Sequence, residues 1–309
     1  MKKSIIAAAL AATVAAPAAN ANVVFYGTVN VSIDYFTDND DDQRFWSVKS
    51  NDSTIGFKGT EDLGNGLSLI WNAQTYYDFA DGDAWGGGFG SYIGLAGDWG
   101  TFMYGVLDTP VMMSTAALDL FADTVADYNM SPDAIQDVTA ANAIAYVSPN
   151  MNGLTVAAAI VPGEDGAAPN GISGTGLADA YSVAAMYSNN GLYLSAGGYE
   201  DLGDDHDKWR VGAGYTINAV TLNAVYEDDN DNGKTWQISG AYDFGNNTAK
   251  AMYMSEDSGD DKAWAIGLDH ALSKRTKAYA VYVNGEDQVS VHGYGDDAAA
   301  FSMGMIHNF

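Results

Sequence analysis

Apolar and polar residues alternate with a period of two along most of this 309-residue chain, a pattern that favours β-strands over helices. In "YGTVNVSIDYF" the apolar members of the alternation are Val29, Val31 and Ile33. Such alternation puts apolar side chains on one face of a strand and polar side chains on the other. The pattern recurs in "LSLIWNAQTYYDF", "KWRVGAGYTI" and "KTWQISGAYD", so the chain is predicted to be all-β.

The connections between these segments are of two kinds. Short turn signals such as "GNG" at 64–66 and "NNG" at 189–191 alternate with longer acidic stretches such as "TDNDDDQ" and "EDDNDNGK". Tyr and Trp gather at segment ends. Strands of about ten residues, short turns at one rim, long loops at the other and aromatic girdles predict a transmembrane antiparallel β-barrel of about 16 strands. A soluble β-sandwich or jelly roll is the alternative, but it buries its apolar face and does not require this regularity.

The first 21 residues differ from the rest of the sequence. Lys2 and Lys3 precede an apolar run, which ends at Ala19-Asn20-Ala21. This is the pattern of a secretory signal peptide. A membrane anchor is disfavoured because the apolar run is shorter than the ~20 residues of a spanning helix. We therefore expect a signal peptide over 1–21 and a barrel domain over 22–309.

The last residues, "SMGMIHNF", continue the alternation to the end of the sequence. Phe301, Met303, Met305, His307 and Phe309 fall on one parity. A sheet that spans lipid can have no open edge. We expect this segment to be the final strand, paired with the first.

Charge and composition exclude several classes of protein. The formal net charge is -27, which argues against nucleic acid as a partner and suits a protein that repels anions. The chain contains no cysteine, so disulfides and thiolate metal sites are impossible. A hydrophobic fraction of 47% and an aromatic fraction of 12% are too high for a disordered acidic chain.

Three stretches resemble the general, trimeric porins of Gram-negative bacteria. "IGFKGTEDLGNGLSLIW" (55–71), "SYIGLAGDWGTFMYGVLDTP" (91–110) and "ANAIAYVSPNMNGLTVAAAI" (141–160) resemble porin strands two to seven, and the ending His307-Asn308-Phe309 resembles the family's last strand. The resemblance implies a homotrimer in the cell outer membrane, in contact with its lipid and lipopolysaccharide. It also implies that Phe309 is an assembly signal read by the outer-membrane assembly machinery; a ring that fills the interface girdle is a compatible interpretation.

The resemblance also assigns a role to the segment at about 108–140. In trimeric porins the connection after strand five folds back into the barrel and narrows the pore. Leu118, Phe121 and Val125 fall at helical spacing here and predict a short helix, with the first three of the loop acids on one face. The candidate acids of the pore constriction loop are Asp119, Asp123, Asp127, Asp133 and Asp137. The alternative is a solvated external loop with ordinary surface acids.

The pore wall departs from the pattern of general porins, which set basic side chains opposite the acidic loop. The aligned wall positions are Thr28, Thr54, Val106 and Val147, all neutral. Lys58 shares the parity of Thr54 and is a candidate wall cation, and Arg44, Lys49, Lys208 and Arg210 are further candidates. We therefore expect an acidic constriction with little opposing charge and a preference for cations. A sugar-selective pore would carry an aromatic track, for which Tyr76, Tyr104 and Tyr128 are candidates.

Catalytic and metal motifs find little support. His206, His270, His292 and His307 form no paired motif, so no enzyme is expected. The stretch 228–233 fits the first half of an EF-hand loop, but Ser239 stands at the twelfth position and strands flank it. No metal site or cofactor is predicted, although the acidic loops are candidates for weak Ca²⁺ binding.

The predicted function is passive diffusion of small hydrophilic solutes and ions through an outer-membrane pore. The alternative is a non-conducting barrel that serves as an adhesin or structural anchor through its acidic loops.

Overall fold

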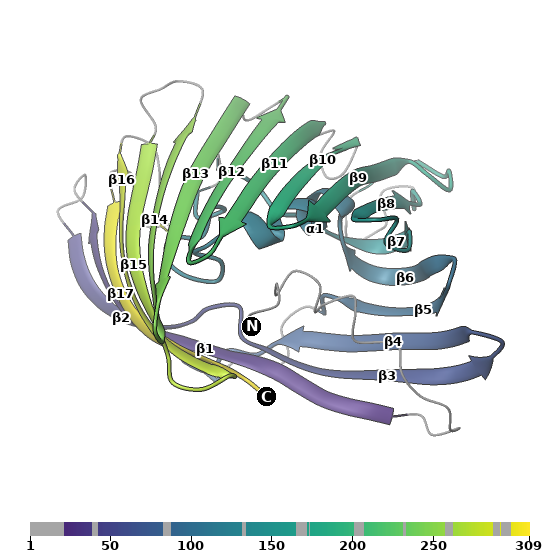
Figure 1. Ribbon diagram of the computed structural model, residues 1–309, viewed down its shortest axis with the longest axis horizontal. Helices are drawn as coiled ribbons and strands as arrows, with labels where there is room; N and C mark the ends of the chain where they lie inside the picture. The colour runs from purple at the N-terminus through teal and green to yellow at the C-terminus, as the bar shows by residue number, and fades with distance from the viewer. Residues whose placement is uncertain are drawn as a thin grey trace.

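The alternating segments form antiparallel strands that close into a barrel, as predicted (Figure 1). The computed structural model describes residues 22–38, 43–82, 88–131, 134–164, 172, 174–200, 207–230, 233–256, 262–286, 291 and 298–309. The expected signal peptide, residues 1–21, lies outside the described residues.

The described part of the chain contributes 17 strand segments to one sheet. Along the chain these are β1 (Asn22–Asp38), β2 (Gln43–Ser50), β3 (Thr54–Gly64), β4 (Leu67–Tyr76), β5 (Ser91–Gly97), β6 (Gly100–Asp108), β7 (Thr139–Val147), β8 (Leu154–Val161), β9 (Ala180–Asn189), β10 (Leu192–Glu200), β11 (Lys208–Ile217), β12 (Val220–Asp229), β13 (Gly233–Phe244), β14 (Asn247–Glu256), β15 (Lys262–Ala271), β16 (Thr276–Glu286) and β17 (Ala298–Asn308).

Two of these segments are the halves of one interrupted strand. β1 pairs with β3 over Asn22–Thr28 and with β2 over Val31–Asp38. The interruption lies between them, where Asp52 has a φ of 47°. Taken together, β2 and β3 count once, so the wall formed by the described residues has 16 strands and the predicted number is confirmed.

The last strand closes the barrel against the first. β17 pairs with β1 from Asn308 opposite Thr28 to Ala298 opposite Asp38. Beyond that register, the amide of Phe309 donates to the Gly27 carbonyl at 3.1 Å. The ring of Phe309 lies 5.2 Å from that of Phe25, measured between centroids, and a Cβ at Gly27 would collide with it. The expected pairing of the last segment with the first strand is confirmed.

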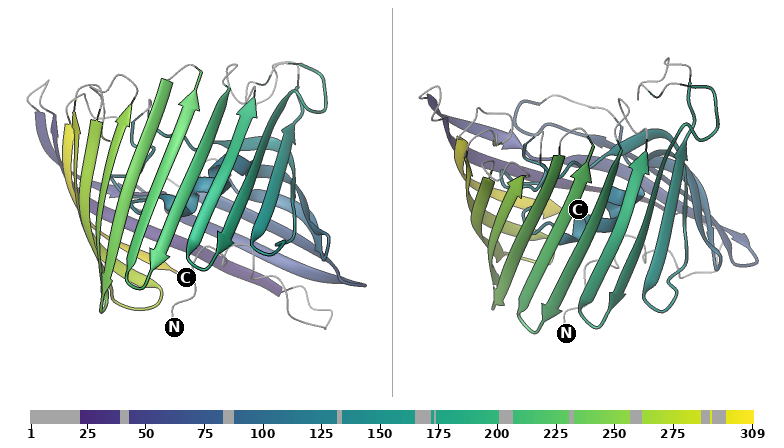
Figure 2. Two further views of the ribbon diagram at one scale, coloured as in Figure 1. Left: turned by 45° about the horizontal axis from the view of Figure 1, so that its top comes forward. Right: turned by 90° about the horizontal axis from the view of Figure 1, so that it is seen from above.

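Connections of two lengths alternate around the barrel. Two-residue turns join β3 to β4, β9 to β10, β11 to β12 and β13 to β14, and these short turns gather at one rim (Figure 2). Asn190 and Gly191 illustrate them: both have a positive φ, and a Cβ on Gly191 would run into the Thr216 carbonyl. The longer connections, including 77–90 and 109–138, join the strands at the opposite ends.

Along the strands, apolar side chains are exposed and polar side chains are buried, the reverse of the arrangement in a water-soluble protein. The outward face is apolar and exposed, as at Leu222, Ile238 and Ile266, whose exposed fractions are 60%, 51% and 54%. The inward face is polar and covered: Asn30, Ser32 and Asp34 are at most 1% exposed. An exposed apolar band is stable only in contact with lipid, so the barrel spans a membrane.

Tyr–Trp pairs recur on adjacent strands. The pairs Tyr35–Trp46, Trp209–Tyr226, Trp236–Tyr253 and Trp264–Tyr282 have ring centroids 4.9 to 5.5 Å apart and tilts of 40° to 49°. Rings with an apolar body and a polar atom suit the boundary between lipid and water. The predicted aromatic girdle is therefore built from cross-strand pairs.

A short helix lies inside the ring of strands (Figure 1). α1 (Pro110–Thr115) begins at Thr109, whose hydroxyl accepts from the Met112 amide, and Pro110 occupies a first-turn position that needs no donor. A 3₁₀ turn, η2 (Ala116–Leu118), follows. Across the described ranges, no helix has the length and apolar character needed to cross a membrane.

The assignment of faces can be tested with one outward and one inward arginine. Ile238→Arg places a charge in the lipid-facing band near the middle of β13 and should reduce the free energy of unfolding by about 2–4 kcal/mol. Thr221→Arg, on the inner face of β12, should cost much less because its charge meets water. Urea titrations of both proteins in lipid vesicles measure this. Equal losses would contradict the assignment.

Candidate functional site

The connection between β6 and β7, described over residues 109–131 and 134–138, runs through the interior of the barrel (Figure 1). Leu118, Tyr128 and Ile135 of this segment, hereafter the inner loop, pack with Tyr193 and Val225 of the wall. Each of the three is at most 2% exposed. Burying a side chain of this size contributes about 1.5–3 kcal/mol, so the loop is fixed by packing. A solvated external loop, the alternative interpretation, does not describe this segment.

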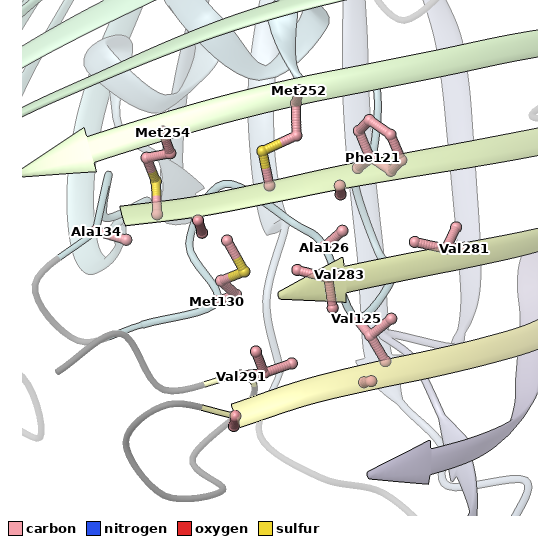
Figure 3. Packing of buried hydrophobic residues seen from close by; sticks show 14 of the residues in the cluster. Phe121, Val125, Ala126, Met130, Ala134, Met252, Met254, Val281, Val283 and Val291 are labelled. Carbon is pink, nitrogen blue, oxygen red and sulfur yellow. The ribbon is translucent and has the colours of Figure 1, made fainter. Parts of the chain in front are cut away.

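A second part of the inner loop packs against the last strands of the wall. Phe121, Val125 and Met130 point toward side chains of β14 and β16, among them Met254 and Val283 (Figure 3). Phe121 and Val125 are fully buried. The loop therefore covers a continuous part of the inner wall.

Glycines on the wall make room for this packing. A Cβ on Gly212 of β11 would collide with Leu118 and would lie 3.1 Å from the Thr115 methyl group. A Cβ on Gly267 of β15 would lie 2.9 Å from the Phe121 ring. Larger residues there would displace the loop.

Wall side chains also hold the backbone of the inner loop. Four carbonyls of the loop accept hydrogen bonds: Ser114 from Tyr193 at 2.7 Å, Leu118 from Asn223 at 2.9 Å, Leu120 from Lys250 at 2.8 Å and Asp123 from Asn30 at 2.6 Å. These donors come from β10, β12, β14 and β1. Carbonyls that the irregular loop leaves unpaired thus find partners on the wall.

Arg210 of β11 is the centre of the strongest attachment. Its guanidinium is fully buried and donates to the Asp137 carboxylate at 2.7 Å, to the Thr115 hydroxyl at 2.7 Å and to the Gln136 carbonyl at 2.5 Å. Glu227 of β12 pairs with the same guanidinium at 2.6 Å. A planar group with five donors can satisfy several acceptors at once. One wall residue therefore joins both ends of the inner loop.

Two of the predicted constriction acids bind the loop's own backbone. Asp119 accepts from the amides of Phe121 at 2.7 Å and Tyr128 at 3.1 Å, and Asp127 accepts from those of Asp123 at 2.8 Å and Asn129 at 3.0 Å. Both side chains are at most 9% exposed. They shape the loop from within.

The predicted helix around Leu118–Val125 is wrong, and these hydrogen bonds explain why. Successive four-residue turns follow residue 119, in which the Thr124 amide donates to the Phe121 carbonyl and the Asp127 amide to the Thr124 carbonyl. Aspartate and threonine side chains that bond nearby amides compete with helix formation. In the described inner loop the one α-helix is α1, and the 3₁₀ turn η2 that follows it ends at Leu118, the first residue of the apolar spacing that predicted a helix.

The remaining candidate acids have different surroundings. Asp123 has an exposed side chain and a φ of 58°, so the three acids do not share a helix face. Asp137 pairs with Arg210 and also accepts from the Tyr128 hydroxyl at 2.7 Å. Asp133 lies outside the described residues.

Burial changes the ionisation of the two structural acids. Burial raises the pKa of Asp119 to about 6, although the Tyr128 and Phe121 amides oppose the rise. Burial also raises the pKa of Asp127 well above its usual value, and the neighbouring Asp119 charge adds to this effect. Part of the loop's negative charge is therefore lost under mildly acidic conditions.

The wall positions predicted from motif alignment are largely on the inner face. Thr28 and Thr54 lie opposite each other on β1 and β3, and the Thr28 hydroxyl donates to Asn308 at 2.8 Å. Val147 is 2% exposed on the inward parity of β7, with Ala143 and Ala145. Val106 sits at a register shift between β6 and β7, so its parity does not decide its direction.

Basic side chains are more numerous on the inner wall than the alignment indicated. Lys208 pairs with Glu227 at 3.2 Å and Asp229 at 2.9 Å. Lys250 and Lys277 each lie 3.1 Å from Asp269. The expectation of little opposing charge is wrong for the wall of β11 to β16. These bases are, however, matched by carboxylates of the same wall.

The other side of the lumen is less covered. Lys58 of β3 is exposed, with its ammonium 4.5 Å from the Tyr26 ring centroid. Tyr76 at the end of β4 is 37% exposed, and Asn72 and Gln74 are half-buried. The inner loop packs mainly against the β9–β17 side, and its Val111 and Val138 belong to a cluster that includes Tyr92 of β5. The inward side chains that it leaves least covered lie on β3 and β4.

Comparisons with known proteins agree with this architecture. A family model described as Gram-negative porin matches residues 7–289. The chain belongs to the Gram-negative porin family. Major outer membrane protein P.IB of Neisseria lactamica is 32% identical over 215 residues, which cover 64% of this chain and 58% of that protein. The matched region thus spans less than two thirds of that relative's length.

Solved porin structures share the fold. An anion-selective porin from Comamonas acidovorans has a TM-score of 0.76 at 20% identity, covering 94% of this chain and 100% of the other. The trimer form of OmpT, an outer membrane protein of Vibrio cholerae, has a TM-score of 0.65 at 16% identity, covering 94% and 99%. The family and the barrel place this porin in the outer membrane of a Gram-negative bacterium.

Sequence reasoning missed how this porin holds its inner loop. Lys208 and Arg210 were candidates for the inner face, but nothing in the sequence linked Arg210 to Asp137. The small residues Gly212 and Gly214 on the inward parity of β11 were an available signal, because glycine in a strand marks a close approach. His270 and His307, considered for catalysis, instead contact Asn247 and Thr276 at 2.8 Å each.

The attachment through Arg210 can be tested by conductance. Arg210→Gln leaves the carboxylates of Asp137 and Glu227 without their shared guanidinium, a change that costs about 3–5 kcal/mol for a buried pair. The barrel should still form, because the strand pairing remains, but the inner loop should detach. We expect a larger and noisier single-channel conductance than in Arg275→Gln, whose arginine lies in an exposed turn. Identical current traces would contradict this role of Arg210.

Proposed function

We propose that this porin is a passive diffusion channel for small hydrophilic solutes and ions, with a preference for cations. The observation that carries the proposal is the division of the lumen. One side is filled by the inner loop, and the other presents half-exposed polar and aromatic side chains along β3 to β5. A polar, partly narrowed interior serves diffusion, whereas an adhesin or anchor does not require it.

Charge on the open side supports the preference for cations. Asp52, Asp108 and Asp123 lie near enough to Tyr76 to act electrostatically on its hydroxyl. The bases of β11, β14 and β16 contact carboxylates of their own side. Three carboxylates and the exposed Lys58 thus lie on the open side, which gives this side a net negative charge. The anion-selective porin of Comamonas acidovorans shares the fold at 20% identity. At that identity its charged residues do not predict the charged residues of this pore.

The assembly of the channel follows the family in this proposal. We infer a homotrimer, because solved relatives include a trimer form. Residues 1–21 serve as a signal peptide for export. Phe309, whose backbone bonds to Gly27 beyond the last register pair, is the residue that the assembly machinery reads. The acidic outer loops contact lipopolysaccharide and bind Ca²⁺ weakly.

The cation preference has a direct electrical test. A potential of about 1.4 kcal/mol per unit charge at the narrow point enriches cations about tenfold there. The zero-current potential across a bilayer with a KCl gradient should have the sign of a cation-selective channel. The triple variant Asp52→Asn, Asp108→Asn and Asp123→Asn should move it toward zero, most clearly at low salt. Asp98→Asn, in an exposed turn, is the control. An anion-selective wild type would overturn the preference.

The same potential should depend on pH. Burial raises the pKa of Asp119 to about 6, and desolvation inside the barrel raises the pKa of Asp123 to about 7, so both carboxyl groups are ionised at pH 8 and largely neutral at pH 5. Cation preference should therefore be stronger at pH 8 and decline as the pH falls through about 7 and 6. The double variant Asp119→Asn and Asp123→Asn should flatten this part of the profile. A wild-type profile without change between pH 8 and 5 would count against an electrostatic role for the buried acids.

A further inference from the structure

An aromatic surface lies on the open side of the lumen. Tyr76 and Phe89 stack with ring centroids 4.2 Å apart and an angle of 12° between their planes. Both are on the inward parity, since Tyr76 pairs with Thr54 and the Phe89 amide bonds to the Gln74 carbonyl. Tyr76 keeps 37% of its surface exposed. Unlike the outward tyrosines, this pair faces the path of a solute.

Three carboxylates from separate parts of the chain lie in the neighbourhood of this aromatic pair. Asp52 projects from the interruption between β2 and β3, Asp108 ends β6, and Asp123 lies on the inner loop. Hydrogen bonds link these parts of the chain: the Tyr77 amide donates to the Ser53 carbonyl at 3.0 Å, the Asn30 amide to the Ser53 hydroxyl at 2.9 Å, and the Asn30 side chain to the Asp123 carbonyl at 2.6 Å. Asp108 acts electrostatically on the hydroxyls of Tyr76 and Tyr92. The break in the strand, the end of β6 and the inner loop thus converge on one aromatic surface.

The same wall already holds an ammonium group against a tyrosine. The Lys58 ammonium lies 4.5 Å from the centroid of the Tyr26 ring, and the Tyr26 hydroxyl lies 2.6 Å from the side-chain oxygens of Asn72 and Gln74, where its single proton is donated to one of them. The face of an aromatic ring attracts a cation through its quadrupole, and a nearby carboxylate adds a Coulomb attraction. This surface therefore suits positive charge carried on an organic group.

We propose that the surface formed by Tyr76, Phe89, Asp52, Asp108 and Asp123 is a binding site for organic cations that pass through the channel, such as solutes with a guanidinium group. A guanidinium is planar and weakly hydrated, so it can stack on a ring while bonding a carboxylate. Hydrated K⁺ gains from the carboxylates but little from the rings. This inference rests on the proposed channel function and adds a class of solute to it.

The test uses a matched pair of solutes. L-arginine and L-citrulline have nearly the same size and shape, but only the arginine side chain is charged. Uptake of each radiolabelled solute is measured at low concentration in proteoliposomes that contain the full-length channel. We expect arginine to enter faster than citrulline, and its uptake to saturate at lower concentration because it binds.

Two variants separate the aromatic contribution from the charge. Tyr76→Leu keeps an apolar side chain but removes the ring face, and should slow arginine uptake about two- to fivefold while citrulline uptake stays unchanged. Phe89→Leu, which removes the stacking partner, should act in the same direction. Tyr104→Leu, at a tyrosine that is 51% exposed on the outward face, should leave both rates unchanged.

The outcomes distinguish this site from the channel itself. If KCl conductance of Tyr76→Leu matches the wild type while arginine uptake falls, the ring contributes to solute binding. If arginine uptake does not change, or if both solutes slow equally, the aromatic site is refuted and the channel proposal stands. If the wild-type protein conducts neither KCl nor either solute, the channel proposal fails. Equal heat-modifiable mobility of each variant in gels shows that the barrels are folded.

Discussion

Every backbone amide and carbonyl of this chain that lies in lipid must find its partner within the sheet, and the rest of the structure follows from that requirement. β1 pairs with β17 over Thr28–Asp38 on one edge, and with β3 and β2 on the other. Where the second strand is interrupted, hydrogen bonds persist: the Asn51 amide bonds to the Asn30 carbonyl at 2.8 Å, and the Ser53 hydroxyl accepts from the Asn30 amide at 2.9 Å. The chain can therefore turn inward at Asp52 without exposing unpaired groups to lipid.

The period-two alternation determines which way each side chain points as well as the secondary structure. This is why the sequence predicted the barrel wall so well. A residue's parity decides whether it meets lipid or the interior, and register errors would reverse a whole strand. Lys208 and Arg210 lie inside, as parity required. The inner loop lacks such a rule. Leu118, Phe121 and Val125 have helical spacing because they pack onto the curved wall at several points, while Asp119 and Thr124 hold the backbone in turns. Their apolar spacing reflects tertiary contacts that no local pattern encodes.

The buried charges around Arg210 show how an irregular loop is kept in one arrangement. Burial of an ion pair removes favourable hydration, so such a network contributes less to stability than its short distances indicate. Its geometry is nevertheless specific. Arg210 reaches Thr115 near the beginning of the loop and Asp137 near its end, while Glu227 supplies the opposing charge from β12. Gly212 and Gly267 leave space that only the correctly seated loop fills. Charge and shape together position the loop.

Those same contacts determine where the remaining charge lies. Bases on the β11–β16 side are paired with carboxylates beside them, and their fields largely cancel beyond a few ångströms. Asp108 and Asp123 instead face the open side, together with Asp52 and the ring of Tyr76. The inner loop packs against one half of the wall. As a result, Asp123 of the loop and Asp108 at the end of β6 are directed toward the other half. The asymmetry of the lumen arises from the packing of Phe121 and Val125 against the wall, with the Lys250 ammonium 4.7 Å from the Phe121 ring centroid, and it is this packing that gives the open side its negative and aromatic character.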